Sequence, residues 1–247
     1  MRTASACNIG ACRMVNQDRI FASAEPVGAL PNLFIVADGM GGHAAGETAA
    51  QEAVDFCVRY ASESSMEETD AFFYQMAAQT NAHVYALSQS HAEYAGMGTT
   101  LVAASILPDG VYCVNVGDSR MYMVDHKDRF VRVTRDHSLV ELMVSKGELT
   151  EEEARVHPKR NYITRAVGTA PEVEADLYKL PAGYARMLLL CSDGLSSQIA
   201  DERISEIIKT RSLSLTERVD MLVNEANRNG GTDNISIILI EMEGVEA

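Results

Sequence analysis

Four aspartates follow short apolar runs at points where glycine or another small residue interrupts the chain. A carboxylate at the tip of an apolar strand has left the pleated surface but is still held by the strand. If four such tips meet at one end of a sheet, their mutual repulsion requires a cation between them. Carboxylate-rich oxygen sites suit Mg²⁺ or Mn²⁺, so the sequence predicts a metal-centred active site. The four are Asp38 in FIVADGMGG, Asp118 in CVNVGDSRM, Asp193 in LLLCSDGL and Asp233 in GGTDNIS.

Composition narrows the class of protein and its partners. The 247 residues, 47% hydrophobic and 23% charged, are typical of a globular protein with a sizeable core. The formal net charge of −14 argues against nucleic acids and anionic membranes as partners, because phosphate contacts need Lys or Arg. Neither a signal peptide nor an apolar run of about 20 residues is present, so we expect no membrane insertion. The five cysteines predict reduced, mostly buried thiols in a cytoplasmic protein.

The order of apolar patterns predicts an α+β fold. Residues 33–37 form a short apolar run typical of a buried strand, and apolar residues recur at helical spacing over 44–63 and 66–88. The period then changes to that of strands. The links between these strands are too short for a crossover helix, so we expect an antiparallel meander. Its predicted strands are 99–107, 111–116, 120–124 and 130–134.

The second half of the chain predicts more helices and two or three further strands. A helical stripe lies within 136–155, and Thr150 is placed to cap a further short helix. No linker or repeat interrupts the chain, so we expect one domain with helices in two blocks around antiparallel sheet. The remaining predicted elements are strands at 173–180, 187–191 and 234–240 and helices at 204–209 and 216–227.

A dinucleotide-binding loop is the nearest competing interpretation. Residues 39–44, GMGGHA, match G-x-G-x-x-A between a predicted strand and a predicted helix. However, Asp38 would bring a negative charge to the pyrophosphate position. The acidic residue expected about 20 positions later, at the end of a second strand, is also missing. The predicted meander differs from the alternating βαβ units of such folds, so we favour the metal site.

A phosphate-binding cation precedes the first predicted strand. The segment Arg13-Met14-Val15-Asn16-Gln17-Asp18 places a guanidinium five residues before a carboxylate. The planar guanidinium donates two parallel hydrogen bonds to a phosphate. Taken alone, Arg13 would equally suit a solvated surface position.

Together these motifs resemble the PP2C-type (PPM family) metal-dependent protein serine/threonine phosphatases in their compact bacterial form. The resemblance implies a four-layer α-β-β-α sandwich of two antiparallel sheets flanked by helices, as one phosphatase domain over 1–247. It also implies a flap subdomain at about 137–165. The matching motifs occur in family order, as Arg13–Asp18, Asp38–His43, Gly98-Thr99-Thr100, Gly117–Arg120, Ser192-Asp193-Gly194 and Gly231–Asn234.

The resemblance assigns the metal ligands. It implies that Asp38 bridges two Mn²⁺ or Mg²⁺ ions and that the carbonyl of Gly39 binds one of them. Asp193 and Asp233 would hold the other ion. Asp118, with Asp193, matches the residues that bind a weaker third metal in bacterial members.

Other roles are carried over from the same motifs. Arg13 would bind the substrate phosphate, and Asp18 would act mostly through metal-bound water. Many members have Glu where this chain has Gln17, a difference that predicts weaker or water-mediated binding of one ion. No residue matches the family's general-acid histidine cleanly, and His43 is the nearest candidate.

The implied reaction is hydrolysis of phosphoserine and phosphothreonine in proteins by a hydroxide that bridges the two ions. The implied partners are phosphorylated proteins, including a Hanks-type Ser/Thr kinase and its substrates. One alternative is a non-catalytic phosphoprotein-binding regulatory module of the same fold, which the loss of ligand carboxylates would mark. Another is a relative acting on phosphorylated anti-sigma-factor antagonists, a group that usually carries sensor domains.

Overall fold

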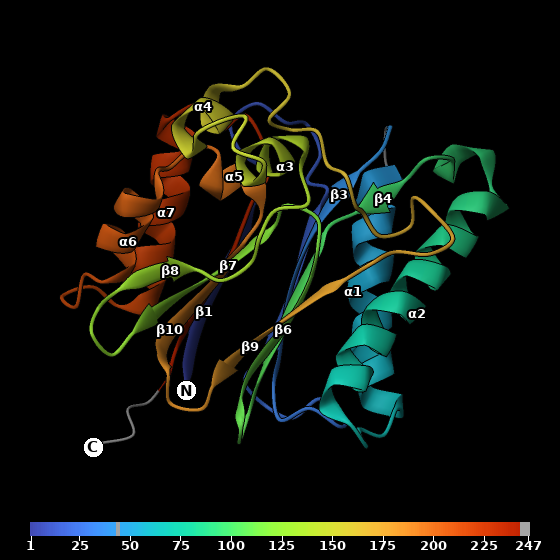
Figure 1. Cartoon of the computed structure of the whole chain (residues 1–247), viewed down its shortest axis with the longest axis horizontal. Coiled ribbons are helices and arrows are strands. Elements are labelled where there is room, and N and C mark those ends of the chain that lie inside the picture. The colour runs from blue at the N-terminus through green and yellow to red at the C-terminus, as the bar shows by residue number, and fades with distance from the viewer. Residues whose placement is uncertain (43–44, 243–247) are drawn as a thin grey trace.

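The computed structural model describes residues 1–42 and 45–242, and Figure 1 shows two antiparallel sheets side by side. All described strand pairings are antiparallel, which excludes the parallel sheet of a dinucleotide-binding fold. Sheet I has the order β1 (Arg2–Asn8), β11 (Ile235–Glu241), β10 (Ala185–Cys191), β7 (Arg120–Asp125), β8 (Phe130–Arg132). Sheet II has the order β2 (Asp18–Ser23), β3 (Leu33–Met40), β5 (Leu101–Leu107), β6 (Gly110–Val116), β9 (Asp176–Pro181), and β4 (Gly98–Thr99) pairs with β3.

Helices cover the outer face of each sheet, so the predicted four-layer α+β sandwich is confirmed (Figure 1). Sheet II is covered by α1 (Ala45–Glu63) and α2 (Thr69–Ser90), after which the short η1 (Ala92–Tyr94) follows. Sheet I is covered by α5 (Asp193–Ser196), α6 (Asp201–Ile208) and α7 (Leu215–Arg228). Between β8 and β9 lie α3 (Leu139–Ser145) and α4 (Glu151–Val156). Thr150 caps α4 as predicted, in a capping box with Glu153.

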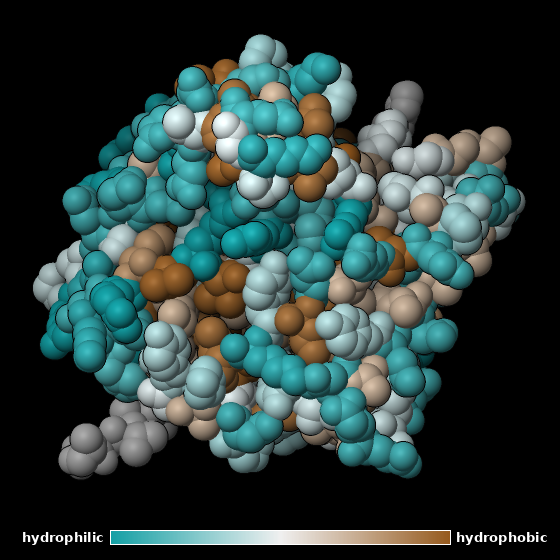
Figure 2. All heavy atoms as spheres, in the orientation of Figure 1, coloured by the Kyte–Doolittle hydropathy of each residue, from teal (hydrophilic) through white to brown (hydrophobic). Residues whose placement is uncertain are grey.

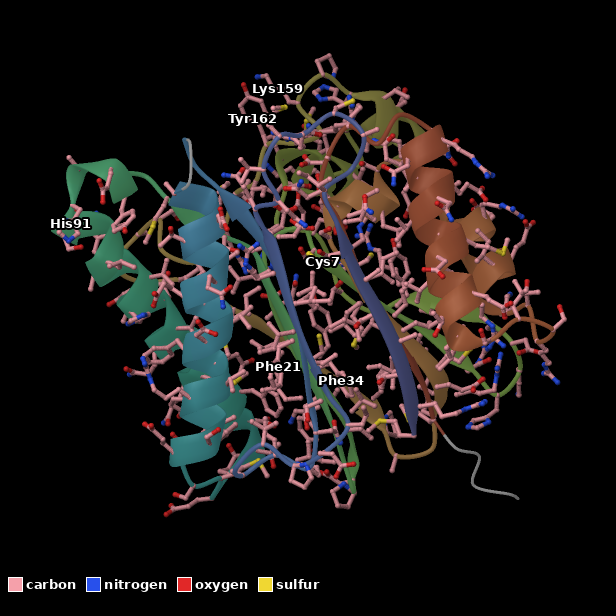
Figure 3. The ribbon with its side chains drawn as sticks, turned by 180° about the vertical axis from the view of Figure 1, so that it is seen from behind. Cys7, Phe21, Phe34, His91, Lys159 and Tyr162 are labelled. Atoms are coloured by element: carbon pink, nitrogen blue, oxygen red, sulfur yellow. The ribbon has the colours of Figure 1, made fainter. Side chains whose placement is uncertain are left out.

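Alternation along the strands builds three separate apolar layers. In β3, Ile35 packs toward α1 and α2, whereas its neighbours Phe34 and Val36 pack between the two sheets. Figure 3 labels Phe34 in this position. In β10, Leu189 likewise packs toward α6 and α7, and Leu190 packs between the sheets. Because both faces of these strands are buried, their sequences are continuous apolar runs rather than alternating ones.

The predicted meander is wrong at its centre. Strands β5 and β6 pair in sheet II, but β7 pairs with β10 in sheet I. The chain therefore changes sheets at Gly117-Asp118-Ser119, and Gly117 adopts a φ of 109° there. A short link joins neighbouring strands of one sheet or, as here, strands of two sheets that pack face to face. Strands β1 and β2 were not predicted either, since β1 is mostly exposed and lacks an apolar run.

The surface is that of a protein with a fully buried core. Hydrophilic residues cover most of the face in Figure 2, and apolar residues form small separate areas between them. Cys57, Cys113 and Cys191 are buried, as predicted, while Cys7 and Cys12 are exposed free thiols. No described helix has both the length and the apolar character needed to cross a membrane.

Candidate active site

The predicted aspartates meet in one cleft of about 650 Å³ at the end of the two sheets. Asp18 opens β2 and lies directly opposite Asp38 of β3 in the strand register. Asp193 follows β10 at the start of α5, and Asp233 comes just before β11. The cleft is lined by Arg13, Gln17, Asp38, Gly39, Asp118, Asp193, Asp233 and the 161–166 segment, among others.

Burial and mutual repulsion make these carboxyl groups hard to ionise together. Burial, with smaller contributions from neighbouring carboxylates, raises the pKa of Asp18 to about 7. The same two causes raise the pKa of Asp193 to about 6, although a hydrogen bond with Asp38 opposes the rise. The pKa values of Asp38 and Asp118 are also raised well above their usual range, chiefly by burial. A site that holds these groups ionised therefore needs positive charge.

The donor set fits divalent cations. Asp18, Asp118 and Asp193 each have a buried Oδ1 with no hydrogen-bond partner among the described residues. Buried carboxylate oxygens are normally paired, so these three are available as hard-cation ligands. No three described His, Cys, Asp or Glu side chains already form a ligand cluster.

Arg13 lies in the cleft and is bound to one of the aspartates. Its Nη2 is 2.7 Å from Oδ2 of Asp233, and the Arg13 side chain is half exposed. The hydrogen bond and charge of Asp233 raise the pKa of Arg13, so the guanidinium stays positive. The remaining N–H donors of this guanidinium face solvent beside the aspartates, where they could bind a phosphate.

Three hydroxyl groups and one amide hold the aspartates, and sequence reasoning gave none of them a role. Ser192 Oγ donates to Asp18 Oδ2 at 2.7 Å. The Thr100 backbone N–H donates to the Asp38 carbonyl at 2.8 Å, and the Asp38 N–H donates to Thr100 Oγ1 at 3.0 Å. Thr99 Oγ1 donates to the same carbonyl at 3.0 Å, and Asn234 Oδ1 accepts from the Gln17 N–H at 2.8 Å. In the sequence, these four residues were marked only by their positions within the motifs that resemble the phosphatase family.

Close backbone packing explains the glycine after Asp38. A Cβ on Gly39 would lie 2.0 Å from the carbonyl oxygen of Gly46, in the first turn of α1. The Gly39 N–H also donates to the Gln17 carbonyl at 3.2 Å. Gly39 thus lets the start of α1 approach the strand tip, which needs no nucleotide. His43, the candidate general acid, lies outside the described residues.

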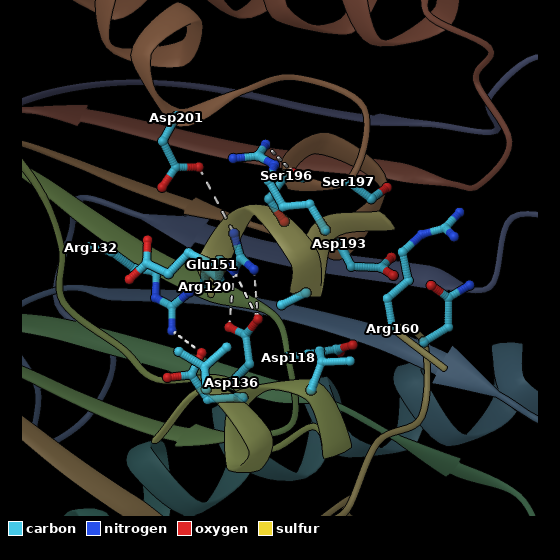
Figure 4. A pocket seen from close by; sticks show the side chains of 16 residues that line it. Asp118, Arg120, Arg132, Asp136, Glu151, Arg160, Asp193, Ser196, Ser197 and Asp201 are labelled. Atoms are coloured by element: carbon cyan, nitrogen blue, oxygen red, sulfur yellow. Dashed lines mark hydrogen bonds and ion pairs between the residues drawn. The ribbon is translucent and has the colours of Figure 1, made fainter. Parts of the chain in front are cut away.

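A second cavity of about 120 Å³ adjoins the cleft beneath α3 and α4 (Figure 4). Asp118 and Asp193 line both spaces. Arg120 donates to Asp136 through Nε at 2.9 Å and through Nη2 at 2.6 Å. Because Arg120 is paired with Asp136, its charge only partly offsets those of Asp118 and Asp193, and a further cation is still needed.

Comparison with known proteins gives a consistent family. A model described as "Protein phosphatase 2C" matches residues 12–231. The serine/threonine phosphatase stp of Listeria innocua is 38% identical over 213 residues, which cover 85% of this chain and 84% of that protein.

Solved structures give the same result. The chain superimposes on serine/threonine phosphatase Stp1 from Staphylococcus aureus with a TM-score of 0.90 and 32% identity, covering 98% of this chain and 95% of that one. It also resembles the catalytic domain of the phosphatase PstP in complex with two manganese ions, with a TM-score of 0.82 and 30% identity over 97% of each chain.

Proposed function

This chain belongs to the protein phosphatase 2C family, and from that premise we propose how its cleft carries out the reaction. The protein is a metal-dependent serine/threonine protein phosphatase of the bacterial form. We propose that it hydrolyses phosphoserine and phosphothreonine in proteins and that it opposes a Hanks-type Ser/Thr kinase. The observation that supports this most directly is the convergence of Asp38, Asp193 and Asp233 on one cleft beside Arg13. A non-catalytic module would not need to keep this set of carboxylates together.

We assign the ligands as follows. Asp38 and the Gly39 carbonyl would hold one Mn²⁺ or Mg²⁺, and Asp193 and Asp233 would hold a second that Asp38 shares. Asp118 with Asp193 would hold a weaker third. When bound, the cations supply a water of lowered pKa and neutralise charge on the phosphate.

The chain's own residues bind and orient the substrate. Arg13 is placed to donate two parallel hydrogen bonds to phosphate oxygens, which would partly replace its hydrogen bond to Asp233. Asp18 is fully buried and anchored by Ser192, so it orients groups in the cleft rather than contacting substrate. We further propose that the whole chain is one phosphatase domain whose 137–165 segment, here called the flap, covers the cleft mouth. Tyr162 and Arg165 of the flap line the cleft.

Substrate and metal dependence provide the first test. We expect Mn²⁺-dependent release of phosphate from a phosphothreonine peptide, faster than from a phosphotyrosine peptide of the same flanking sequence, and none after addition of EDTA. Malachite-green detection across a Mn²⁺ titration measures this. Activity that persists in EDTA, or a preference for phosphotyrosine, would contradict the proposal.

Arg13→Ala is expected to raise KM for p-nitrophenyl phosphate by about tenfold or more. The reason is that hydrogen bonds to charged groups contribute roughly 1.5–3 kcal/mol. The matched variant Arg13→Lys keeps the charge but not the planar fork, so its KM should lie between those of wild type and Arg13→Ala. Steady-state kinetics at saturating Mn²⁺ measures both. An unchanged KM in Arg13→Ala would remove this residue from the phosphate site.

A further inference from the structure

His137 is a buried imidazole that holds the backbone of the turn carrying Asp118. Its ring Nδ1 accepts a hydrogen bond from the Gly117 N–H at 3.1 Å. The backbone N–H of His137 donates to the Gly117 carbonyl at 2.9 Å. On the other side of the turn, a Cβ on Gly117 would lie 2.6 Å from Thr100 Cγ2. Gly117 is therefore fixed between Thr100 and His137, and it directly precedes Asp118.

The other ring nitrogen of His137 points to the end of the flap. Nε2 lies 3.3 Å from Asp176 Oδ2, and Arg165 Nη1 donates to Asp176 Oδ1 at 2.9 Å. The His137 carbonyl accepts from the Thr164 N–H at 2.7 Å. Because Nδ1 accepts from Gly117, the proton of the neutral ring is on Nε2. Nε2 lies 3.3 Å from both Asp176 Oδ2 and Arg165 Nη1, and of these two groups only the Asp176 carboxylate can accept the proton. The ring and the backbone of His137 together thus connect the Asp118 turn with Asp176 and with the C-terminal end of the flap.

Asp118 depends on this clamp for its orientation. The residue is only 7% exposed, and its Oδ1 is buried without a hydrogen-bond partner among the described residues. The orientation of this oxygen is therefore set by the backbone of the turn rather than by a hydrogen bond of its own. Ser119, on one side, is fixed by a 2.7 Å hydrogen bond between its Oγ and Thr100 Oγ1. On the other side, the His137 ring holds the Gly117 N–H, while the His137 backbone N–H and Asn115 Nδ2, at 2.9 and 3.3 Å, hold the Gly117 carbonyl.

We propose that His137 is a positioning residue of the phosphatase reaction, which aims the Asp118 carboxylate into the cleft by clamping Gly117. The inference rests on the function proposed above, in which Asp118 serves the cations. A purely structural histidine would instead need only its bulk and its burial.

Two substitutions at His137 test the hydrogen bonds of Nδ1 and Nε2 separately. The amide oxygen of His137→Asn can take the place of Nδ1 and accept from Gly117, but this side chain is too short to reach Asp176. The longer His137→Gln can place its amide near Nε2 and donate to Asp176, but it offers no acceptor to Gly117. The reference variant is Asp118→Asn, which removes the carboxylate charge directly.

We expect His137→Gln to reproduce the Asp118→Asn defect and His137→Asn to stay close to wild type. Loss of one hydrogen bond to the turn should weaken Mn²⁺ binding about two- to tenfold, measured by isothermal titration calorimetry and by the Mn²⁺ concentration for half-maximal p-nitrophenyl phosphate hydrolysis. The double variant of His137→Gln with Asp118→Asn should be no worse than Asp118→Asn, because both act through one group. Asp176→Ala, which leaves the Gly117 clamp intact, should bind Mn²⁺ within about twofold of wild type.

The possible outcomes distinguish failure of the role proposed for His137 from failure of the role proposed for Asp118. Urea unfolding of each variant shows whether its folded fraction is comparable, and Asp176→Ala provides a test independent of substitution at His137. A defective Asp118→Asn with a wild-type-like His137→Gln would overturn the role of His137. Equal defects in His137→Asn and His137→Gln, or a Mn²⁺-binding defect in Asp176→Ala, would do the same. A wild-type-like Asp118→Asn would overturn the role of Asp118 itself, and the role of His137 with it.

Discussion

Asp38→Asn is expected to lower Mn²⁺-dependent turnover of p-nitrophenyl phosphate by about 1,000-fold or more, without loss of the fold. Cation-assisted charge stabilisation contributes several kcal/mol to such a reaction, and each 1.36 kcal/mol is a factor of ten in rate. Asp38 is the carboxylate that lies among all the others: it is opposite Asp18 in the strand register, and the charges of the other four aspartates all raise its pKa. Its neutralisation removes the ligand that both proposed ions share.

The same substitution should change stability in opposite directions without and with metal. In metal-free protein, burial and the neighbouring carboxylates make ionisation of Asp38 unfavourable and raise its pKa. An asparagine amide carries no charge at any pH, so the variant avoids this cost and should melt at or above the wild-type temperature. A ligand present at about 100 times its Kd adds about 2.7 kcal/mol to the stability of the folded state. Wild type should therefore gain a large thermal shift from Mn²⁺, and Asp38→Asn should gain much less.

Asp55→Asn is the matched control, because Asp55 lies on α1, does not line the cleft and accepts a hydrogen bond from Gln51. It should keep both the activity and the Mn²⁺-induced thermal shift. Differential scanning fluorimetry across a Mn²⁺ titration, together with initial rates, measures all these quantities. Wild-type turnover in Asp38→Asn, or an equal thermal shift, would sink the metal-site assignment.

The positions of the aspartates could be predicted because two local signals coincide there. An apolar run that stops at Asp-Gly predicts a strand end, and a carboxylate at such an end is unusual enough to need a partner. β10 does end at Cys191, just before Asp193, whereas β3 continues through Asp38 to Met40. The strand content followed from the same runs. The start of α4 followed from its capping residue Thr150, because a cap is a local interaction between residues three apart.

Pairing between distant strands could not be predicted in the same way. A run such as 111–116 shows that both faces of a strand are buried, but it does not say which strand lies beside it. Apart from Gly117, the apolar pattern of the sequence therefore does not indicate that the chain passes from β6 in sheet II to β7 in sheet I. The exposed strand β1 pairs along its whole length with β11, near the other end of the chain. Only tertiary structure reveals such a pairing.

The supporting hydroxyls were hidden for a related reason. Ser192 and Thr100 have no distinctive neighbours in sequence, and their importance comes from contacts to Asp18 and Asp38 across strands. His137 is hidden in the same way, because its partner Gly117 lies 20 positions away. Hydrogen bonds between residues that are distant in sequence thus hold the cleft, and the sequence alone does not show them.

Gly194→Ala should destabilise the fold and disrupt the cleft, although local propensity predicts the reverse. Gly194 lies in the helix α5, where alanine is normally favoured over glycine by about 0.8–1 kcal/mol. In the structure, however, an added Cβ would stand 1.8 Å from the carbonyl oxygen of Asn234 and 2.8 Å from its carbon. The clash is with backbone, so no side chain can move away to relieve it. We expect a loss of about 1–3 kcal/mol or more in the free energy of unfolding.

The clash has a functional consequence because of what lies on its two sides. Asp193 precedes Gly194, and Asp233 precedes Asn234, so relief of the clash must separate two carboxylates that we assign to one cation. Gly194→Ala should therefore also raise the Mn²⁺ concentration needed for half-maximal activity. Gly42→Ala is the matched control, since a Cβ on Gly42 meets nothing within 4 Å. Urea unfolding and Mn²⁺ activation curves measure both effects. If Gly194→Ala were as stable and as readily activated as Gly42→Ala, the tight contact between α5 and β11 would not be what brings Asp193 and Asp233 together.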